Sequence, residues 1–114
     1  MKCLIVDDSK MSRLMVKKII QSSYPDWEII EACDGQEAID VAQGEDFNII
    51  FVDYNMPGMN GGEAAKVLRP LFPDAKIAFL TANIQGAIVN EAKELKIDFI
   101  PKPILEERII KYVR

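Results

Sequence analysis

The stretch that decides the fold is NIIFVD, residues 48–53, followed by YNMPGMNGG, residues 54–62. The first segment is a continuous apolar run, which is typical of a strand that is buried on both faces of a parallel sheet. The second segment is rich in turn-forming residues, so we expect a long loop to follow the strand. The strand therefore ends on a carboxylate, Asp53, at the start of a loop.

Further apolar runs alternate with helical patterns on both sides of this strand. We expect strands over residues 3–6, 27–32, 76–81 and 98–100. Helical patterns are formed by Met11, Leu14, Met15 and Ile19, by residues 36–43 and 63–71, by Ile84, Ile88, Ala92 and Leu95, and by Leu105, Ile109, Tyr112 and Val113. Alternating strands and helices indicate a parallel sheet with helices on both faces. A chain of 114 residues is too short for an eight-unit barrel, which leaves an open, doubly wound sheet.

The composition is that of an ordinary globular protein. Hydrophobic residues make up 49% of the chain and charged residues 28%, which fits one domain over residues 1–114. The net charge of −4 argues against binding nucleic acid through a broad basic face. The sequence has no signal-peptide pattern and no apolar stretch of membrane-spanning length, so we expect a soluble, cytoplasmic protein without a membrane partner.

Several kinds of catalytic site are excluded by composition. The chain contains no histidine, which removes Ser-His-Asp triads, Cys-His pairs and histidine-ligated metals. The two cysteines, Cys3 and Cys33, have no metal-ligand spacing. We interpret Cys3 as a buried free thiol, because it opens an apolar run.

Polar residues follow four of the predicted strands. Asp7 and Asp8 come after the first strand and Asp53 after the third, while Thr81 and Lys102 end the fourth and fifth. Ligands of open α/β sheets bind beyond the carboxyl ends of the strands. If the first and third strands are neighbours, three carboxylates converge there with one lysine, which leaves two negative charges in excess. Magnesium, which prefers carboxylate and phosphate oxygens, fits that deficit.

Simpler explanations exist for each residue taken alone. An aspartate after a strand often caps the next helix, and Asp8, which is followed by Ser9, could do so. Capping explains Asp53 poorly, because a long loop follows it. Thr81 alone is typical of a strand end and Lys102 of a solvated surface. The functional interpretation depends on all four strand ends carrying useful groups together.

The sequence closely resembles the receiver domain of bacterial two-component response regulators, above all the single-domain chemotaxis regulator. The matching segments are LIVDDSKMSR (residues 4–13), IIFVDYNMPGMNG (49–61), AFLTA (78–82) and FIPKP (99–103). The resemblance implies a flavodoxin-like fold, with a five-stranded parallel sheet in the order 2-1-3-4-5. It also implies a phosphorelay switch that is not an enzyme beyond handling its own phosphoryl group.

The resemblance assigns roles to the residues of the pocket. Asp53 would accept a phosphoryl group from the phosphohistidine of a sensor histidine kinase. Asp8, Asp53 and the backbone carbonyl of Asn55 would bind Mg²⁺, and Asp7 would assist through a water molecule. Lys102 would pair with Asp53 and then with the phosphoryl oxygens.

Further residues would read out or shape the phosphorylated state. The Thr81 hydroxyl would hydrogen-bond the phosphoryl group, and the small Ala82 beside it would leave room for an aromatic ring to move. Phe99 would enter the space behind Thr81 and alter a surface that binds a downstream protein. The peptide bond before Pro103 would be cis. Dimerisation on phosphorylation stays open, as does whether the chain is free-standing or part of a larger protein.

The sequence departs from the family pattern at two positions. Pro101 removes one backbone donor directly before Lys102. Phe99 lacks the hydroxyl of the tyrosine that many relatives carry. By analogy with the family, Asn55 and Asn83 would tune the rate of dephosphorylation.

Three alternatives remain open beside the switch. An aspartyl-nucleophile phosphatase requires a second acid two residues after the nucleophile, where this chain has Asn55. A flavin carrier wants a phosphate-binding loop after the first strand, where Asp7 and Asp8 would repel the phosphate. The third alternative is a receiver-like interaction module that is not phosphorylated, although all the pocket residues are present.

Overall fold

The computed structural model describes residues 1–114 as strands and helices in strict alternation. The strands are β1 (Lys2–Val6), β2 (Glu28–Ala32), β3 (Ile49–Val52), β4 (Lys76–Thr81) and β5 (Asp98–Pro101). The helices are α1 (Lys10–Ser23), α2 (Gly35–Ala42), α3 (Gly61–Leu71), α4 (Gly86–Leu95) and α5 (Glu106–Val113). All the predicted elements are present. Ile84, expected in the fourth helix, instead lies in the loop before α4 and is 68% exposed.

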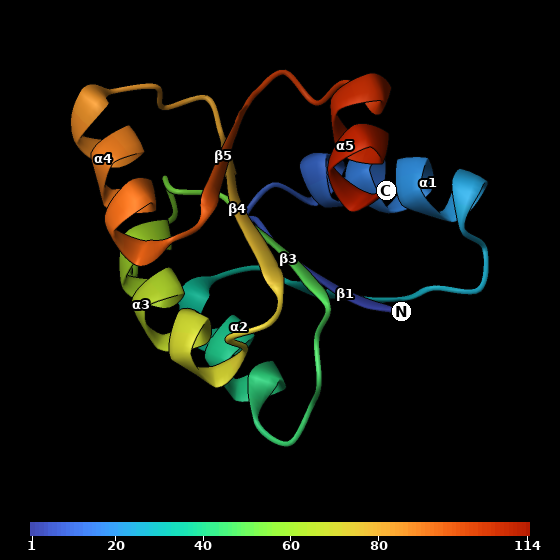
Figure 1. Ribbon diagram of the computed structural model, residues 1–114, viewed down its shortest axis with the longest axis horizontal. Helices are drawn as coiled ribbons and strands as arrows, with labels where there is room; N and C mark the ends of the chain where they lie inside the picture. The colour runs from blue at the N-terminus through green and yellow to red at the C-terminus, as the bar shows by residue number, and fades with distance from the viewer.

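The five strands form one parallel sheet in the order β2-β1-β3-β4-β5 (Figure 1). This confirms the doubly wound fold and the strand order. β3 lies at the centre, and all four of its residues are buried, as its continuous apolar sequence predicted. The winding direction reverses between β1 and β3, so the two loops that leave these strands diverge and open a crevice at their carboxyl ends.

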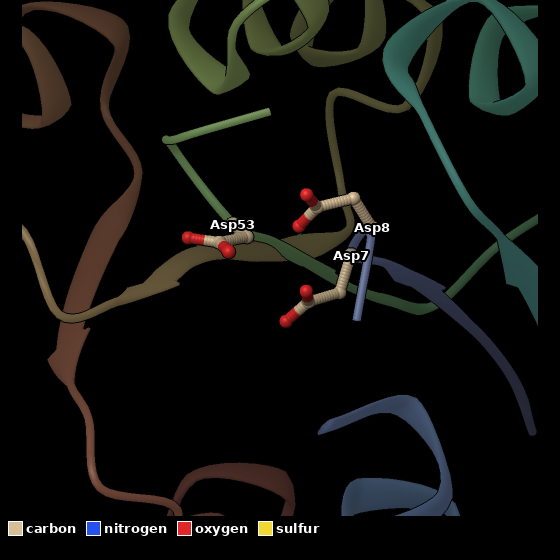
Figure 2. A group of neighbouring side chains, drawn as sticks. All are labelled: Asp7, Asp8 and Asp53. Atoms are coloured by element: carbon tan, nitrogen blue, oxygen red, sulfur yellow. The ribbon is translucent and has the colours of Figure 1, made fainter. Parts of the chain in front are cut away.

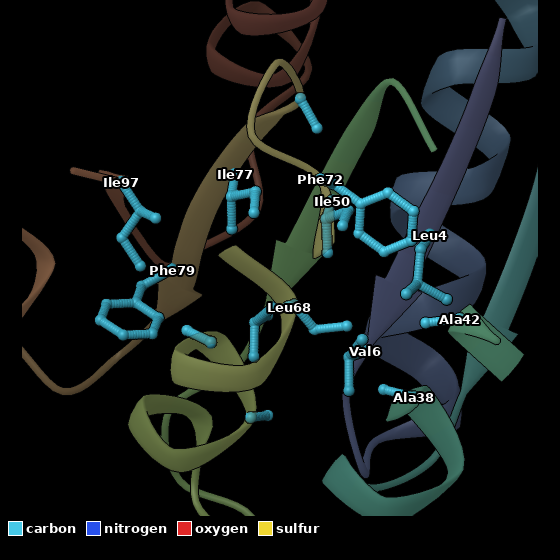
Figure 3. Close-up of a cluster of buried hydrophobic side chains, with 14 of the residues drawn as sticks. Leu4, Val6, Ala38, Ala42, Ile50, Leu68, Phe72, Ile77, Phe79 and Ile97 are labelled. Atoms are coloured by element: carbon cyan, nitrogen blue, oxygen red, sulfur yellow. The ribbon is translucent and has the colours of Figure 1, made fainter. Parts of the chain in front are cut away.

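Helices cover both faces of the sheet. In Figure 1, α1 and α5 lie on one face and α2, α3 and α4 on the other. Successive side chains of a strand point to opposite faces, so Leu4 and Val6 join the core under α2, α3 and α4 (Figure 3). Cys3 and Ile5 join the second core, which α1 and α5 close. The buried free thiol expected at Cys3 is confirmed.

The orientation of α1 differs from the expectation. Of the four residues that gave the helical pattern, Met11, Leu14 and Met15 are 68%, 45% and 42% exposed. Only the fourth, Ile19, packs against the core. The buried face instead carries Val16 and Ile20, which pack in the core that α5 shares. The predicted stripe did not include Val16 or Ile20, and this β-branched pair is the part of α1 that meets the sheet. None of the helices, including the 14-residue α1, has the length and apolar composition needed to cross a membrane.

Candidate functional site

The pairing of β1 with β3 brings two aspartates side by side. Val6 lies opposite Val52 in the parallel register, so the next residues, Asp7 and Asp53, leave the sheet together. The backbone N–H of Asp53 donates to the carbonyl of Val6 at 2.9 Å, which extends the ladder by one residue and fixes the backbone beneath the carboxylate. The two aspartates therefore take their positions from sheet register.

Three carboxylates meet at this edge of the sheet. Asp7, Asp8 and Asp53 each offer an oxygen, and these oxygens lie within 4.8 Å of one another (Figure 2). Asp7 is 3% exposed and Asp53 is 7% exposed, whereas Asp8 faces solvent. Negative charges this close repel one another strongly where water is excluded, so the group favours a bound cation. The expected convergence of the three acids is confirmed.

Lys102 supplies the positive charge nearest to this group. Its backbone N–H donates to the carbonyl of Thr81 at 2.9 Å, which brings the side chain over the ends of the central strands. The ammonium nitrogen lies 3.0 Å from Asp7 Oδ2 and 3.4 Å from Asp53 Oδ2. Its shorter contact is thus with Asp7, not with the expected partner Asp53.

The environment of Lys102 changes its affinity for a proton. Burial is the largest single influence and lowers the pKa of Lys102. The hydrogen bond that Lys102 donates to Asp7 and the charges of Asp53 and Asp7 act in the opposite direction and together outweigh burial, so the pKa of Lys102 is raised. The ammonium group therefore stays charged at neutral pH and offsets one of the carboxylates.

The start of α1 shows which residue caps this helix. Ser9 is the N-cap, and its hydroxyl accepts from the N–H of Ser12. Asp7 Oδ1 accepts from the N–H of Ser9 at 2.9 Å, which orients the Asp7 carboxylate. Asp8 is therefore not the cap of this helix, and the simpler explanation of that residue is wrong.

Two loops meet across the opening of the site. Asn55, after β3, accepts a hydrogen bond at Oδ1 from Asn83 Nδ2, after β4, at 3.2 Å. Thr81 is 1% exposed, and its hydroxyl accepts from the N–H of Asn83 at 3.2 Å. Ala82, between them, is exposed. Thr81 is thus already engaged by the loop that leads into α4.

Phe99 and Pro103 lie further along β5 and its following loop. Phe99 is opposite Phe79 in the register of β4 and β5, and Pro101 is opposite Thr81. The Phe99 ring is half-buried and packs against the core under α2, α3 and α4. The peptide bond between Lys102 and Pro103 is cis, which confirms the isomer that the resemblance implied.

Sequence reasoning missed a contact beside the phosphoacceptor candidate. The hydroxyl of Tyr54 donates to the Glu91 carboxylate in α4, with oxygen–oxygen distances of 3.0 and 3.4 Å. The Tyr54 ring meets Phe79 edge to face at 5.3 Å between centroids. The two hydrogen-bonded residues are separated by 37 positions, and no local pattern in the sequence announces such a pair.

Two glycines at the start of α3 make this approach possible. A Cβ atom on Gly61 would collide with the backbone carbonyl of Asp53, so that position has no room for a side chain. A Cβ atom on Gly62 would meet the carboxylate of Glu91, which would have to move aside. The sequence placed Gly61 and Gly62 only in a turn-rich loop. In the structure this pair lets α3 begin against the backbone of Asp53 and beside Glu91.

Fold and site together define a flavodoxin-like α/β domain with an acidic crevice at the ends of β1 and β3. The profile of the response regulator receiver domain family matches residues 3–114. The chain belongs to this family, and its role is that of a response regulator in two-component signalling.

Curated relatives include free-standing regulators and larger proteins. The chain is 38% identical to the chemotaxis protein CheY of Thermotoga maritima, over 96% of this chain and 92% of that protein. It is 39% identical to a protein-glutamate methylesterase/protein-glutamine glutaminase of Methanosarcina mazei, over 89% of this chain but only 29% of that protein. The second likeness thus concerns a minor part of a longer relative.

Solved structures agree with this assignment. The chemotaxis protein CheY4 of Vibrio cholerae superposes with a TM-score of 0.88 at 33% identity, covering 98% of this chain and 94% of that one. The response regulator TrrA of Thermotoga maritima, in complex with Mg²⁺ and BeF, gives a TM-score of 0.85 at 27% identity, covering 98% and 95%. That relative holds a magnesium ion.

Proposed function

We propose that residues 1–114 form one receiver unit in which Asp53 accepts a phosphoryl group from a sensor histidine kinase. The observation that carries the proposal is the meeting of three carboxylates within 4.8 Å beside the Lys102 ammonium. Asp53 is the nucleophile, because it alone of the three acids follows the central strand β3 and precedes a long loop. The Lys102 ammonium lies 3.4 Å from its Oδ2. Asp7 is engaged by the N–H of Ser9 and by Lys102.

The residues fit a magnesium ion. Three carboxylates and one ammonium leave an excess of two negative charges, and all the available ligand atoms are hard oxygens. Asp8, Asp53 and the Asn55 carbonyl would hold the ion, and Asp7 would bind one of its waters. Bound Mg²⁺ supplies positive charge that stabilises the phosphoryl oxygens during transfer.

The transfer step uses the chain's own groups as follows. A carboxylate oxygen of Asp53 attacks the phosphorus of the kinase's phosphohistidine. An O–P bond forms while the P–N bond breaks, and the electron pair of that bond returns to the imidazole nitrogen. Lys102 turns N–H groups toward the phosphoryl oxygens and so offsets the negative charge on them. Hydrolysis by water later returns the free carboxylate and inorganic phosphate.

The readout begins at Thr81. A phosphoryl group adds up to about two negative charges and three strong acceptors. The Thr81 hydroxyl would turn to donate to one of them, which ends its contact with the N–H of Asn83, now 3.2 Å long. Asn83 lies in the loop that leads to α4 and accepts from the N–H of Gln85, the N-cap residue of that helix. α4 and the edge of β5 at Phe99 would then present an altered surface to a downstream protein.

The test is covalent modification by a small donor. The chain is incubated with Mg²⁺ and a small acyl phosphate, and its intact mass is recorded. We expect one phosphoryl addition in the natural chain, none in Asp53→Ala, and an unchanged addition in Asp74→Ala. Asp74 is a suitable control because it is exposed and precedes β4, at the opposite end of the sheet. Absence of any addition to the natural chain would refute the switch and leave the unphosphorylated interaction module.

Metal binding is tested separately from phosphorylation. Asp8→Ala removes one carboxylate from the acidic group and should weaken Mg²⁺ binding at least about tenfold. The matched control is Asp26→Ala, an exposed aspartate between α1 and β2. Titration of each variant by calorimetry gives the affinity directly, and an unchanged affinity in Asp8→Ala would refute its role as a ligand.

A further inference from the structure

The ammonium group of Lys102 has a third partner that the proposed function does not use. Besides Asp7 and Asp53, it lies 3.4 Å from the hydroxyl oxygen of Ser12, in the first turn of α1. A lysine ammonium carries three N–H groups. Each of the three has one acceptor here, and Ser12 is the only neutral one among them.

Ser12 reaches this position through the turn that opens α1. Asp7 accepts from the N–H of Ser9, and Ser9 accepts in turn from the N–H of Ser12. Arg13, the next residue, donates to the backbone carbonyl of Asp7 at 2.6 Å and to Glu31 at 3.0 Å. The first turn of α1 is thereby fixed to the end of β1, so the Ser12 hydroxyl is held at a defined place beside the acidic crevice.

We propose that Ser12 is a positioning residue for phosphoryl transfer, which acts by anchoring the Lys102 ammonium. The inference rests on the proposed function of Asp53. A neutral acceptor satisfies one N–H without forming another ion pair, so it keeps the ammonium between Asp7 and Asp53. Without the hydroxyl, the ammonium is free to move toward Asp53, whose 3.4 Å contact is the longer of the two carboxylate contacts and has room to shorten. A tighter pair would shield the oxygen that must attack phosphorus.

The two contacts of Lys102 with carboxylates differ in length. The contact with Asp7 measures 3.0 Å and that with Asp53 measures 3.4 Å. The ammonium is thus held nearer to the acid that does not react than to the nucleophile. Ser12 and Asp7 both lie in the segment that runs from the end of β1 into α1, and together they draw Lys102 toward that side.

The experiment measures the rate of phosphorylation of the full chain by a small acyl phosphate at saturating Mg²⁺. Ser12→Ala should lower the maximal rate by about 2- to 10-fold, the range for losing one hydrogen bond. The donor concentration at half-maximal rate should stay within about twofold, because donor binding does not use Ser12. Ser12→Thr keeps the hydroxyl and should restore the rate. Ser22→Ala, in the last turn of the same helix, should leave it unchanged.

Repeating the substitution in a Lys102→Ala variant separates a role in positioning Lys102 from a general effect on folding. In Lys102→Ala, the substitution Ser12→Ala should cause no further loss of rate, since the group it positions is gone. A natural rate in Ser12→Ala, or the same loss in both backgrounds, would overturn the role of Ser12 while leaving Asp53 as the acceptor. A natural chain that takes up no phosphoryl group would instead refute the proposed function and this inference with it.

Discussion

Asp53 has two flanks that are built from different contacts. The charged flank, formed by Asp7, Ser12 and Lys102, holds an ammonium between carboxylates. The aromatic flank, formed by Tyr54, Gly62 and Glu91, joins the loop after β3 to α3 and α4 by one hydrogen-bonded pair and one close approach. The residues of the charged flank take part in phosphoryl transfer. The residues of the aromatic flank hold α3 and α4 in place around Asp53.

The difference teaches how one site can both react and signal. Groups on the charged flank can exchange partners when a phosphoryl group arrives, because each makes hydrogen bonds that an incoming oxygen can replace. The aromatic flank is fixed by close packing instead, since a side chain at the neighbouring Gly61 would collide with the backbone of Asp53 and Tyr54. Rate and stability should therefore respond to substitutions on different sides of Asp53.

The largest effect is expected at Lys102. Lys102→Ala should lower the phosphorylation rate by about 10²- to 10³-fold, as loss of one charge-stabilising donor does elsewhere. It also leaves the buried Asp7 without its ion-pair partner, which should cost up to about 3 kcal/mol of unfolding free energy. Mg²⁺ should restore part of that stability, because it binds only the folded chain. Urea unfolding with and without Mg²⁺ measures the loss of stability and the part that the ion restores. The exposed Lys93→Ala is the control.

The next effect is on stability and concerns Gly61. Gly61→Ala places a methyl group against the backbone of Asp53 and Tyr54 and should cost about 1–3 kcal/mol of unfolding free energy. Gly86→Ala, at the start of α4 with nothing within 4 Å, should instead be neutral or stabilise by up to about 1 kcal/mol. Chemical denaturation compares the two. Equal stabilities would show that the close approach at Gly61 does not constrain the site.

A smaller effect separates the two flanks directly. Tyr54→Phe removes the hydroxyl that donates to Glu91 and should cost about 0.5–1.5 kcal/mol of unfolding free energy. Because that hydroxyl does not contact Lys102 or Asp7, the phosphorylation rate should change by less than about twofold. Tyr24→Phe is the control, since the Tyr24 ring stacks on Trp27 and its hydroxyl makes no hydrogen bond. A large loss of rate in Tyr54→Phe would break the distinction between the flanks.

The smallest effect is expected at alkaline pH. Burial raises the pKa of Tyr54 above its usual value of 10.0, and the Glu91 carboxylate raises it further. A raised pKa in the folded state contributes stability that is fully present below the unfolded value and is lost as pH rises through the folded value. Stability should therefore fall from about pH 10 upward, and less steeply in Tyr54→Phe. Thermal unfolding from about pH 9 to about pH 11, roughly one unit each side of the onset, gives the slope.

The sequence predicted the parts of the molecule that depend on local pattern. Continuous apolar runs located the strands, and their ends located Asp7, Asp53, Thr81 and Lys102. In a parallel sheet these ends lie at one edge, so the acidic crevice could be predicted from the sequence alone.

Features that depend on choices between similar residues could not be predicted in this way. α1 offers two apolar stripes, and only packing decides that Val16 and Ile20 are buried while Met11 is exposed. Hydrogen bonds between distant polar residues, such as Tyr54 with Glu91 or Lys102 with Ser12, depend on rotamers and on the spacing of helices. Spacing along the chain carries no signal for either pair.

The most direct test of the central claim is to locate the phosphoryl group along the chain. After incubation with Mg²⁺ and a small acyl phosphate, the chain is digested under acidic conditions and the peptides are sequenced by mass spectrometry. The account predicts a single modified residue, Asp53, and no modification when a chelator removes Mg²⁺. A phosphoryl group on Asp7 or Asp8, or on Asp53 to the same extent without a divalent ion, would contradict it.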